Sequence, residues 1–436
     1  NILNTDRVDL FEKLKQRRGP LGQISGITYG YCQFPKLEGE IANKMMFRDQ
    51  EMLVWSINNY LGLANHPEVR KVDAESAAAH GLSTPMGARM MSGNSVTHER
   101  LEEELSAFVK KEDTMLVNYG YMGMASTVDA LVDRNDVIVY DSECHACIID
   151  GVRMHQGKRF VFAHNDIEKL EVQLKRAEKL IATTGGAILV ITEGVFGMAG
   201  DQGKLREIVA LKKQYDFRLF VDDAHGIGTL GETGAGAGEE QGVQDEIDVY
   251  FGTFAKAFAS VGGFISSTED VIDYLKHNTR SQIFAKSMPM PLVEGNLKRL
   301  ELLRDDPSHK NKLWEIANAL QSGLRDNGFN LGETNSCVTP VYLEGGLMEA
   351  TNLIFDLREN HQIFTSLVVY PVVPKNVILL RLIPTAAHTL EDVAYTIEKF
   401  EIISNKLKNN EYSKDEFTWI KEAPKWITKK SGYVNT

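Results

Sequence analysis

The chain has 436 residues, of which 43% are hydrophobic and 25% are charged, and its formal net charge is -12 at pH 7. This length is enough for more than one domain, and this composition is that of an ordinary globular protein. The excess of acidic residues argues against a broad nucleic-acid surface. No apolar run is long enough to span a bilayer, and the polar residues 1–18 show no secretory signal. We therefore expect a cytoplasmic protein with at most peripheral contact to the inner membrane surface.

Residues 1–55 are predicted to form an N-terminal arm. A basic cluster on its possible first helix comprises Lys13, Lys15, Arg17 and Arg18. The simpler interpretation of this cluster is a solvated helix face, and the functional one is a docking patch for an acidic partner protein.

Apolar, strand-length segments alternate with helix-length amphipathic segments after the arm. Strands are predicted near residues 115–118, 137–140, 187–192, 217–222 and 247–251. This alternation is typical of a parallel α/β sheet, and we assign it to a large domain of residues 56–300. Helices near residues 313–324, 352–358 and 390–407, with strands near 338–343 and 377–383, predict a smaller α+β domain of residues 301–408, followed by a tail of residues 409–436.

Lys256 stands among small and apolar residues in the segment 252–260. A lysine that is buried in a dry pocket has a lowered pKa and becomes a nucleophilic amine, which can form a Schiff base with an aldehyde. A lone lysine at a loop edge more often extends to water, so the inference depends on the neighbours of Lys256.

Asp222, Asp223 and His225 stand at the end of the strand predicted at residues 217–222. Ligands of open parallel sheets bind at the carboxyl ends of the strands. A carboxylate there can keep a pyridine nitrogen protonated, and a Schiff-base lysine with such a partner is what pyridoxal phosphate requires. Taken alone, the two carboxylates and the histidine fit a helix cap or a metal site equally well.

Two further turns after predicted strands carry candidate cofactor contacts. Gly120 and Tyr121 follow the strand near residues 115–118 and precede an apolar helix, so backbone N–H groups there could bind a phosphate. His145 follows the strand near residues 137–140, and its imidazole could stack on a cofactor ring. An ordinary loop histidine is the simpler interpretation of His145.

Two other residues are candidates for binding a substrate carboxylate. Arg381 is the single charge in an apolar strand, and its planar guanidinium matches a carboxylate, while a structural ion pair is the alternative. Asn58 could present its amide to the same carboxylate or only form a turn. Cys144 and Cys147 form an isolated C-x-x-C pair, which is too little for a structural zinc site, so we expect no metal.

These motifs, in this order, resemble the α-oxoamine synthases, a family of fold-type I pyridoxal-phosphate enzymes, over about residues 50–400. The matching motifs are Asn-x-Tyr-Leu-Gly at 58–62, Arg-x-x-x-Gly-x-x-x-x-His at 89–98, His-Ala-x-Ile at 145–148, Val-Asp-Asp-Ala-His at 221–225, Gly-Thr-Phe-x-Lys at 252–256 and the strand of Arg381. The resemblance implies an α/β fold, with a mainly parallel seven-stranded sheet in the large domain and a smaller C-terminal α+β domain.

The resemblance also implies a role for each matching residue. Lys256 would form the Schiff base with the cofactor, Asp222 would pair with the pyridine nitrogen and His225 with the ring oxygen. His145 would stack on the ring. The phosphate contacts would come from Gly120, Tyr121 and Thr253, and Ser287 would also contact the cofactor.

Members of this family condense an amino acid with an acyl thioester, release carbon dioxide and work as homodimers. Asn58 and the loop near Ser287 would contribute to the site across the dimer interface. The acyl donor would be a long-chain acyl-CoA or an acyl-carrier protein, and the basic cluster of the arm would then be the docking patch for the carrier.

Within the family, the chain resembles the bacterial serine palmitoyltransferases but departs from them at several positions. The departures are a longer loop at residues 82–89 and the residues Gly197, Ala255 and Lys286. They are more similar to relatives that use cysteate and make the sulfonate analogue of a sphingoid base. A sulfonate is a fixed anion, so an added cation would suit it. We predict that Lys286, with Ser83 or Thr84, favours cysteate, and a salt bridge of Lys286 at the dimer interface is the alternative.

Three other functions stay open at this point. L-Serine in place of cysteate would make the chain a serine palmitoyltransferase. A short-chain relative would use glycine or alanine with a small acyl-CoA, as a 2-amino-3-ketobutyrate CoA ligase does. The third is a non-catalytic partner subunit, against which the presence of Lys256, Asp222, His225 and His145 argues.

Overall fold

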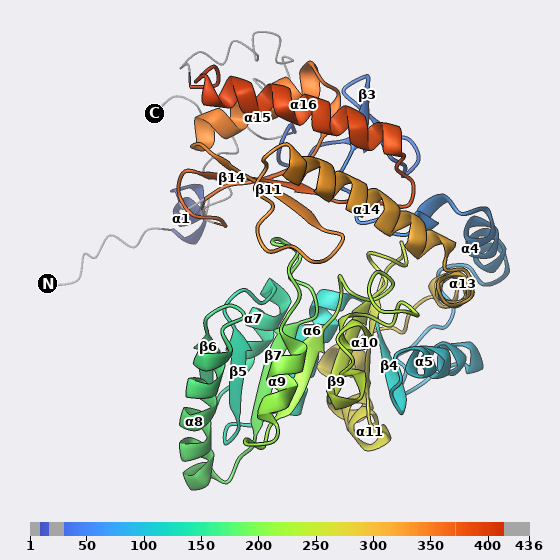
Figure 1. Cartoon of the computed structure of the whole chain (residues 1–436). Helices are drawn as coiled ribbons and strands as arrows, with labels where there is room; N and C mark the ends of the chain where they lie inside the picture. Colours follow the sequence, from blue (N-terminus) through green and yellow to red (C-terminus); the bar gives the residue numbers. More distant parts are fainter. Residues whose placement is uncertain (1–8, 17–29, 371, 414–436) are drawn as a thin grey trace, which may run out of the picture.

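The computed structural model describes residues 9–16, 30–370 and 372–413. Figure 1 shows two bodies of secondary structure, one built on a large sheet and the other carrying the long helices α14, α15 and α16. Among the described residues, no helix has the length and apolar character needed to cross a membrane.

The large body is a seven-stranded sheet in the order β4-β10-β9-β8-β7-β5-β6. Neighbouring strands are parallel except at β10, which is antiparallel to both β4 and β9. The strands are β4 (Asp113–Val117), β5 (Val137–Asp141), β6 (Lys158–Phe162), β7 (Ile188–Glu193), β8 (Arg218–Asp222), β9 (Val249–Thr253) and β10 (Gly263–Ser267). The predicted mainly parallel seven-stranded sheet is confirmed, and all five strands predicted between residues 115 and 251 are present within one or two residues.

Helices cover both faces of this sheet, which explains why its central strands are mainly apolar. In β8, Leu219 and Val221 pack into one apolar cluster and Phe220 packs into another on the opposite face. The covering helices include α5 (Val96–Phe108), α6 (Gly120–Leu131), α7 (Ala146–Met154), α8 (Ile167–Thr184), α9 (Leu205–Leu211) and α11 (Glu269–Asn278). A further helix pair, α4 (Pro67–His80) and α13 (Met290–Asp305), packs beside α5. The short elements are η1 (Leu63–Asn65), α10 (Ala237–Glu240), η2 (Gln244–Glu246) and α12 (Arg280–Ile283).

The C-terminal part is an antiparallel three-stranded sheet in the order β11-β14-β13 with three helices. Its elements are α14 (Ser308–Asp326), β11 (Thr339–Glu344), α15 (Leu347–Glu359), β13 (Ser366–Val368), β14 (Val377–Leu382) and α16 (Leu390–Lys408). Helix α16 begins with a capping box in which Thr389 and Asp392 bond each other's backbone N–H groups. The predicted helices and strands of this part are confirmed.

The N-terminal arm does not stand apart from the C-terminal part. Strands β1 (Leu37–Glu38), β2 (Lys44–Phe47) and β3 (Gln50–Val54) form a sheet with β12 (Ile363–Phe364), which pairs in parallel with β3. Trp55 donates from its indole N–H to Thr396 Oγ1 at 3.0 Å in the shared core. The predicted first helix is present as α1 (Leu10–Gln16), while Arg17 and Arg18 lie outside the described residues.

Candidate active site

The candidate site forms where neighbouring parallel strands end at one edge of the large sheet. Strand β7 ends at Glu193, β8 at Asp222 and β9 at Thr253, three residues before Lys256. The three strands are parallel neighbours, so their last side chains meet there, as the sequence predicted. Burial lowers the pKa of Lys256, although the carboxylates of Asp222 and Glu193 oppose that shift. Lys256 therefore has the environment of a nucleophilic amine.

The two adjacent aspartates Asp222 and Asp223 have different surroundings in the structure. Asp222 accepts the backbone N–H of Ala224 and faces the charges of Lys256 and His145. Asp223 is turned into the opposite packing layer, where its Oδ2 accepts from Tyr250 at 2.9 Å, and burial raises its pKa to about 7. Asp222 is thus the carboxyl group that faces the site.

His145 is the N-cap residue of α7, and its ring is held from two sides. Its Nδ1 lies 3.0 Å from the thiol of Cys147, and the ring of Tyr121 meets it edge-on with centroids 6.1 Å apart. Its backbone N–H donates to Glu193 Oε1 at 2.5 Å. Neither Glu193 nor Cys147 was predicted as a residue of the active site, although Glu193 ends a predicted strand and such positions often face ligands.

His225 is buried and contacts the buried Tyr60, which was not predicted as a residue of the active site. Its Nδ1 lies 2.7 Å from the hydroxyl of Tyr60. Burial, with the charges of Lys256 and Arg381, lowers the pKa of His225 well below its usual value, so the imidazole is neutral. Its Nε2 lies against Gly197, where an added Cβ would come within 2.2 Å. Glycine at position 197 therefore leaves room for this ring.

A cradle for a phosphate lies at the N-terminus of α6. A Cβ at Gly120 would lie 3.4 Å from Thr253 Oγ1 and 3.1 Å from the Phe251 ring, so the absence of a side chain keeps this space free. The first backbone N–H groups of a helix attract anions, and Thr253 adds a hydroxyl. The phenol of Tyr121 bonds Asp150 instead, so Tyr121 can offer the cradle its backbone rather than its hydroxyl.

Arg381 reaches the site from β14 of the C-terminal part. Its Nε donates to the carbonyl of Gly197 at 2.5 Å, and its charge lowers the pKa of both Lys256 and His225. Within the described part of the chain Arg381 makes no ion pair, so the structural ion pair considered above is not found there. Asn58 also has a buried Oδ1 with no hydrogen-bond partner among the described atoms. A substrate carboxylate would suit the free guanidinium.

The three predicted sulfonate contacts lie close together although they are far apart in sequence. Lys286 Nζ donates to the carbonyl of Leu82 at 3.0 Å, and Ser83 and Thr84 are the next two residues. The hydroxyl of Thr84 is used locally, because it donates to the His80 carbonyl at 2.8 Å. Ser83 is exposed and Lys286 is partly exposed in the described chain.

Ser287 is held against the glycine-rich loop. Its N–H donates to the carbonyl of Gly87 at 2.8 Å, and a Cβ at Gly93 would come within 2.7 Å of its Oγ. The Ser287 hydroxyl itself is buried and lacks a hydrogen-bond partner among the described atoms. A cofactor contact by Ser287 stays a prediction.

Two residues of the Arg-to-His motif support these loops. Arg89 binds both carboxylate oxygens of Glu102, which also accepts the backbone N–H of Leu116. His98 Nε2 lies 2.8 Å from the carbonyl of Met288. Both side chains therefore hold these loops in place. The motif alone did not predict this structural role.

Cys144 and Cys147 are both buried free thiols. Across residues 9–16, 30–370 and 372–413, no cluster of three or more metal-ligating side chains is found. Burial raises the pKa of both thiols, so they are neutral packing groups in this structure.

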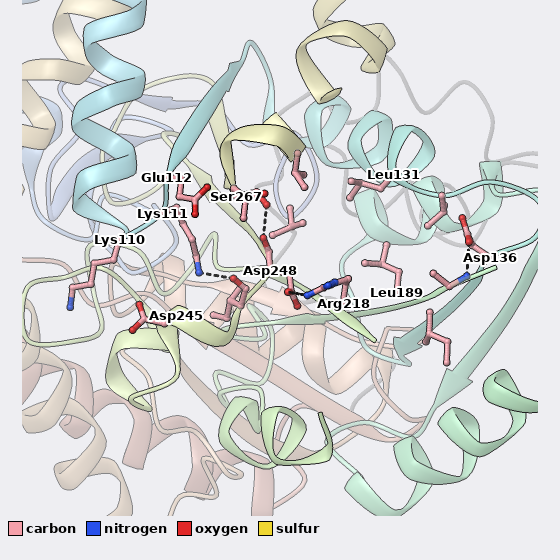
Figure 2. Close-up of a pocket in the computed structure, with 17 residues that line it drawn as sticks. Lys110, Lys111, Glu112, Leu131, Asp136, Leu189, Arg218, Asp245, Asp248 and Ser267 are labelled. Carbon is pink, nitrogen blue, oxygen red and sulfur yellow. Dashed lines mark hydrogen bonds and ion pairs between the residues drawn. The ribbon is translucent and has the colours of Figure 1, made fainter. Parts of the chain in front are cut away.

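A cavity of about 720 Å³ lies at the opposite edge of the sheet, where β5, β7, β8 and β9 begin (Figure 2). Its charged side chains bond their neighbours. Lys111 donates to the carbonyls of Gln244 and Ile247 at 2.6 and 2.5 Å, and Arg218 pairs with Asp248 at 3.1 Å. None of the residues that line it belongs to the predicted site, and the chemistry lies at the other end of the strands.

His164 joins two carboxylates behind the site. Its Nδ1 lies 2.9 Å from Asp141, and its Nε2 lies 2.8 Å from Asp201. Burial would lower the pKa of His164, but the hydrogen bonds and charges of these two carboxylates outweigh it and raise the pKa to about 10. Asp201 belongs to the loop that also carries Gly197, so the imidazolium holds that loop in place.

His164→Gln is expected to destabilise the protein at neutral pH by up to about 3–5 kcal/mol, since two carboxylates lose the cation that they share. The folded pKa of about 10 exceeds the ordinary value of 6.5, so this contribution is complete below pH 6.5 and disappears as the pH rises toward 10. Thermal melts of both proteins across this range measure it. His277→Gln, at an exposed histidine, is the control, and a difference in Tm that does not shrink with rising pH would contradict the assignment.

The lysine, the buried carboxylate, the neutral histidine and the anion cradle lie together at the carboxyl ends of parallel strands, and together they define a fold-type I pyridoxal-phosphate enzyme. The chain belongs to the aminotransferase class I and II family, which it matches over residues 50–400. It is 60% identical over 404 residues to the cysteate-C-fatty acyltransferase of Capnocytophaga ochracea, covering 93% of this chain and 96% of that protein.

Two further relatives support the same family. The serine palmitoyltransferase of Sphingobacterium spiritivorum is 35% identical over 369 residues, which cover 85% of this chain and 90% of that protein. A solved structure of a serine palmitoyltransferase with its pyridoxal-phosphate internal aldimine superposes with a TM-score of 0.83 at 27% identity, covering 92% of this chain and all of that one. The fold, the enzyme class and the cofactor expected from the sequence are therefore confirmed.

The described residues fit this cofactor. Lys256 would hold its aldehyde carbon, Asp222 its ring nitrogen, and Gly120 with Thr253 its phosphate. When bound, pyridoxal phosphate supplies an electron sink for a carbanion beside the amino nitrogen. The neutral His225 can donate or accept a hydrogen bond at Nε2, and Tyr60 holds the ring that presents it.

Proposed function

We propose that this chain condenses L-cysteate with a long-chain acyl thioester and releases carbon dioxide, giving a 3-keto long-chain base for sulfonolipid synthesis. The observation that carries the proposal is 60% identity to a cysteate-C-fatty acyltransferase along almost the full length of both proteins. The position of Lys286 beside Ser83 supports it, because a sulfonate needs a cation and hydrogen-bond donors.

In this proposal one part of the chain binds the cofactor and the other contacts the substrate. Residues 56–300 hold the cofactor, and residues 301–408 bring Arg381 to the substrate carboxylate, with the side-chain NH2 of Asn58 as a second donor. Lys286, with Ser83 or Thr84, binds the sulfonate at the other end of the substrate. Lys256, with its lowered pKa, then accepts the α-proton at Nζ.

We propose a homodimer, whose interface covers the loops around Lys286. The support is a set of large apolar side chains that are exposed on these loops and on the adjoining end of α6: Leu82, Met86, Met91, Tyr119, Met122 and Phe284. Such a group of exposed apolar side chains is typical of a contact surface. The acyl donor would be an acyl-CoA or an acyl-carrier protein, met in the cytoplasm with at most peripheral membrane contact.

A serine palmitoyltransferase is the second candidate, and one observation favours it. The amine of Lys286 already has a partner in the carbonyl of Leu82, so its role could be limited to joining the two loops. L-Serine has no fixed anion and would not need this cation.

Titration with L-cysteate and with L-serine, followed through the cofactor absorbance, distinguishes the two. Lys286→Ala is expected to raise the L-cysteate concentration for half-saturation by about tenfold and to leave that for L-serine within about twofold, since one charge-assisted hydrogen bond is lost. Lys286→Arg should keep most of the cysteate affinity because it keeps the charge.

Lys179→Ala, at an exposed lysine of α8, is the matched control and should change neither titration. If Lys286→Ala weakens the binding of both amino acids equally, the role of this lysine is structural. Saturation by L-serine without a response to L-cysteate would overturn the proposed substrate.

A further inference from the structure

Glu193 and Asp222 occupy paired positions on two neighbouring strands. They are register partners at the ends of the parallel strands β7 and β8, so their side chains lie on the same face of the sheet. Only 5% of Glu193 and 3% of Asp222 is exposed. Two carboxyl groups are therefore confined together under the candidate site.

The surroundings of Glu193 supply little positive charge. The titratable groups that face it are Asp141, Cys144, His145, Cys147, Asp222 and Lys256. Burial raises the pKa of Glu193 well above its usual value, and the negative charge of Asp222 raises it further. Two buried carboxyl groups beside a single lysine cannot both ionise at low cost, so one keeps its proton.

The hydrogen bonding indicates which carboxyl group keeps the proton. Asp222 accepts the backbone N–H of Ala224, and this bond and the charge of Lys256 oppose the rise in pKa that burial gives Asp222. Glu193 accepts one N–H, that of His145, at 2.5 Å. A protonated carboxyl group retains its carbonyl oxygen as an acceptor, so it can make this bond without a charge.

We propose that Glu193 is a positioning residue that remains uncharged at neutral pH, holds the backbone of His145 at the start of α7 and leaves Asp222 as the one ionised member of the pair, which would face the ring nitrogen of the cofactor. The hydrogen bond that His145 N–H donates to Glu193 fixes the backbone of His145. The imidazole of His145 is thereby held in one position relative to the site. The arrangement does not depend on which amino acid or acyl donor is used.

Two variants separate the hydrogen bond from the charge. Glu193→Gln keeps a carbonyl acceptor of the same reach and is always neutral, so the Kd for pyridoxal phosphate at neutral pH should stay within about threefold of the parent. Glu193→Leu leaves the His145 N–H unpaired in a buried place and should weaken cofactor binding by about tenfold or more. Equilibrium titration of the cofactor-free protein measures both.

Infrared spectroscopy tests the protonation state directly and does not depend on activity. The difference spectrum between the parent and Glu193→Gln at neutral pH should contain the carbonyl stretch of a protonated carboxylic acid. Glu143→Gln, at a glutamate whose side chain is 54% exposed, is the matched control and should lose an ionised carboxylate band instead. The proposal is overturned if Glu193→Gln also loses only a carboxylate band, or if Glu193→Gln weakens cofactor binding as much as Glu193→Leu does.

Discussion

Lys256→Ala is expected to lower turnover on the order of a thousandfold or more, because the site then has no amine to join the cofactor or to accept the substrate proton. The burial that lowers the pKa of Lys256 favours the neutral, nucleophilic form of its amine. The variant should also lose the visible absorbance that borohydride bleaches in the parent protein. Initial rates and absorbance spectra measured on the same preparations check both effects.

Lys256→Arg is the control that separates chemistry from charge. It keeps a cation opposite Asp222 and Glu193, so its thermal stability should stay close to that of the parent. A guanidinium remains protonated and does not form the Schiff base, so turnover should be lost as in the alanine variant. Substantial activity in Lys256→Arg would mean that the lysine acts only through its charge.

Asp222→Asn is expected to lower kcat by about 10²–10³-fold, since it removes a preorganised charge from a buried site while keeping the shape of the side chain. The residue is buried at the site, with Lys256 and His145 as its titratable neighbours. The Kd for pyridoxal phosphate should rise in the same variant. Steady-state kinetics at saturating cofactor separate the effect on kcat from the effect on cofactor binding.

Asp223→Asn is the matched control for this effect. Asp223 is the next residue in the chain and equally buried, but it bonds Ala237 and Tyr250 in the packing layer behind the site. An asparagine oxygen can accept the same two hydrogen bonds, so kcat should change by no more than about threefold. Equal losses in the two variants would show that the local fold, rather than the charge of Asp222, is required.

The sequence predicted the central sheet well because its strands are apolar runs separated by turns and amphipathic helices. Two strands were missed for physical reasons. Strand β6 begins with Lys158 and Arg159 at the exposed edge of the sheet, and β10 is short, begins with glycine and ends in two serines. Neither has the continuous apolar pattern that marks a buried strand.

The candidate site was predictable to the extent that its residues stand at strand ends. Lys256, Asp222, His225 and His145 belong to such local signals, and the structure brings all four together. Glu193 also stands at a strand end, but it was not predicted as a site residue because a single carboxyl group outside a motif gives no specific signal. The position of these residues at strand ends therefore predicted at which end of the parallel strands the active site lies.

The sequence by itself determined the fold class, the cofactor and a candidate lysine to hold it, because strand periodicity and turn motifs are local properties of the chain. Only the tertiary structure decided which partner each side chain meets. Tyr60 reaches His225 across 165 residues and Lys286 reaches Leu82 across 204, contacts that no local pattern encodes. Such pairs arise when the packing of separate strands, helices and loops brings distant segments together, and this packing also turns Asp222 toward the site and Asp223 away from it.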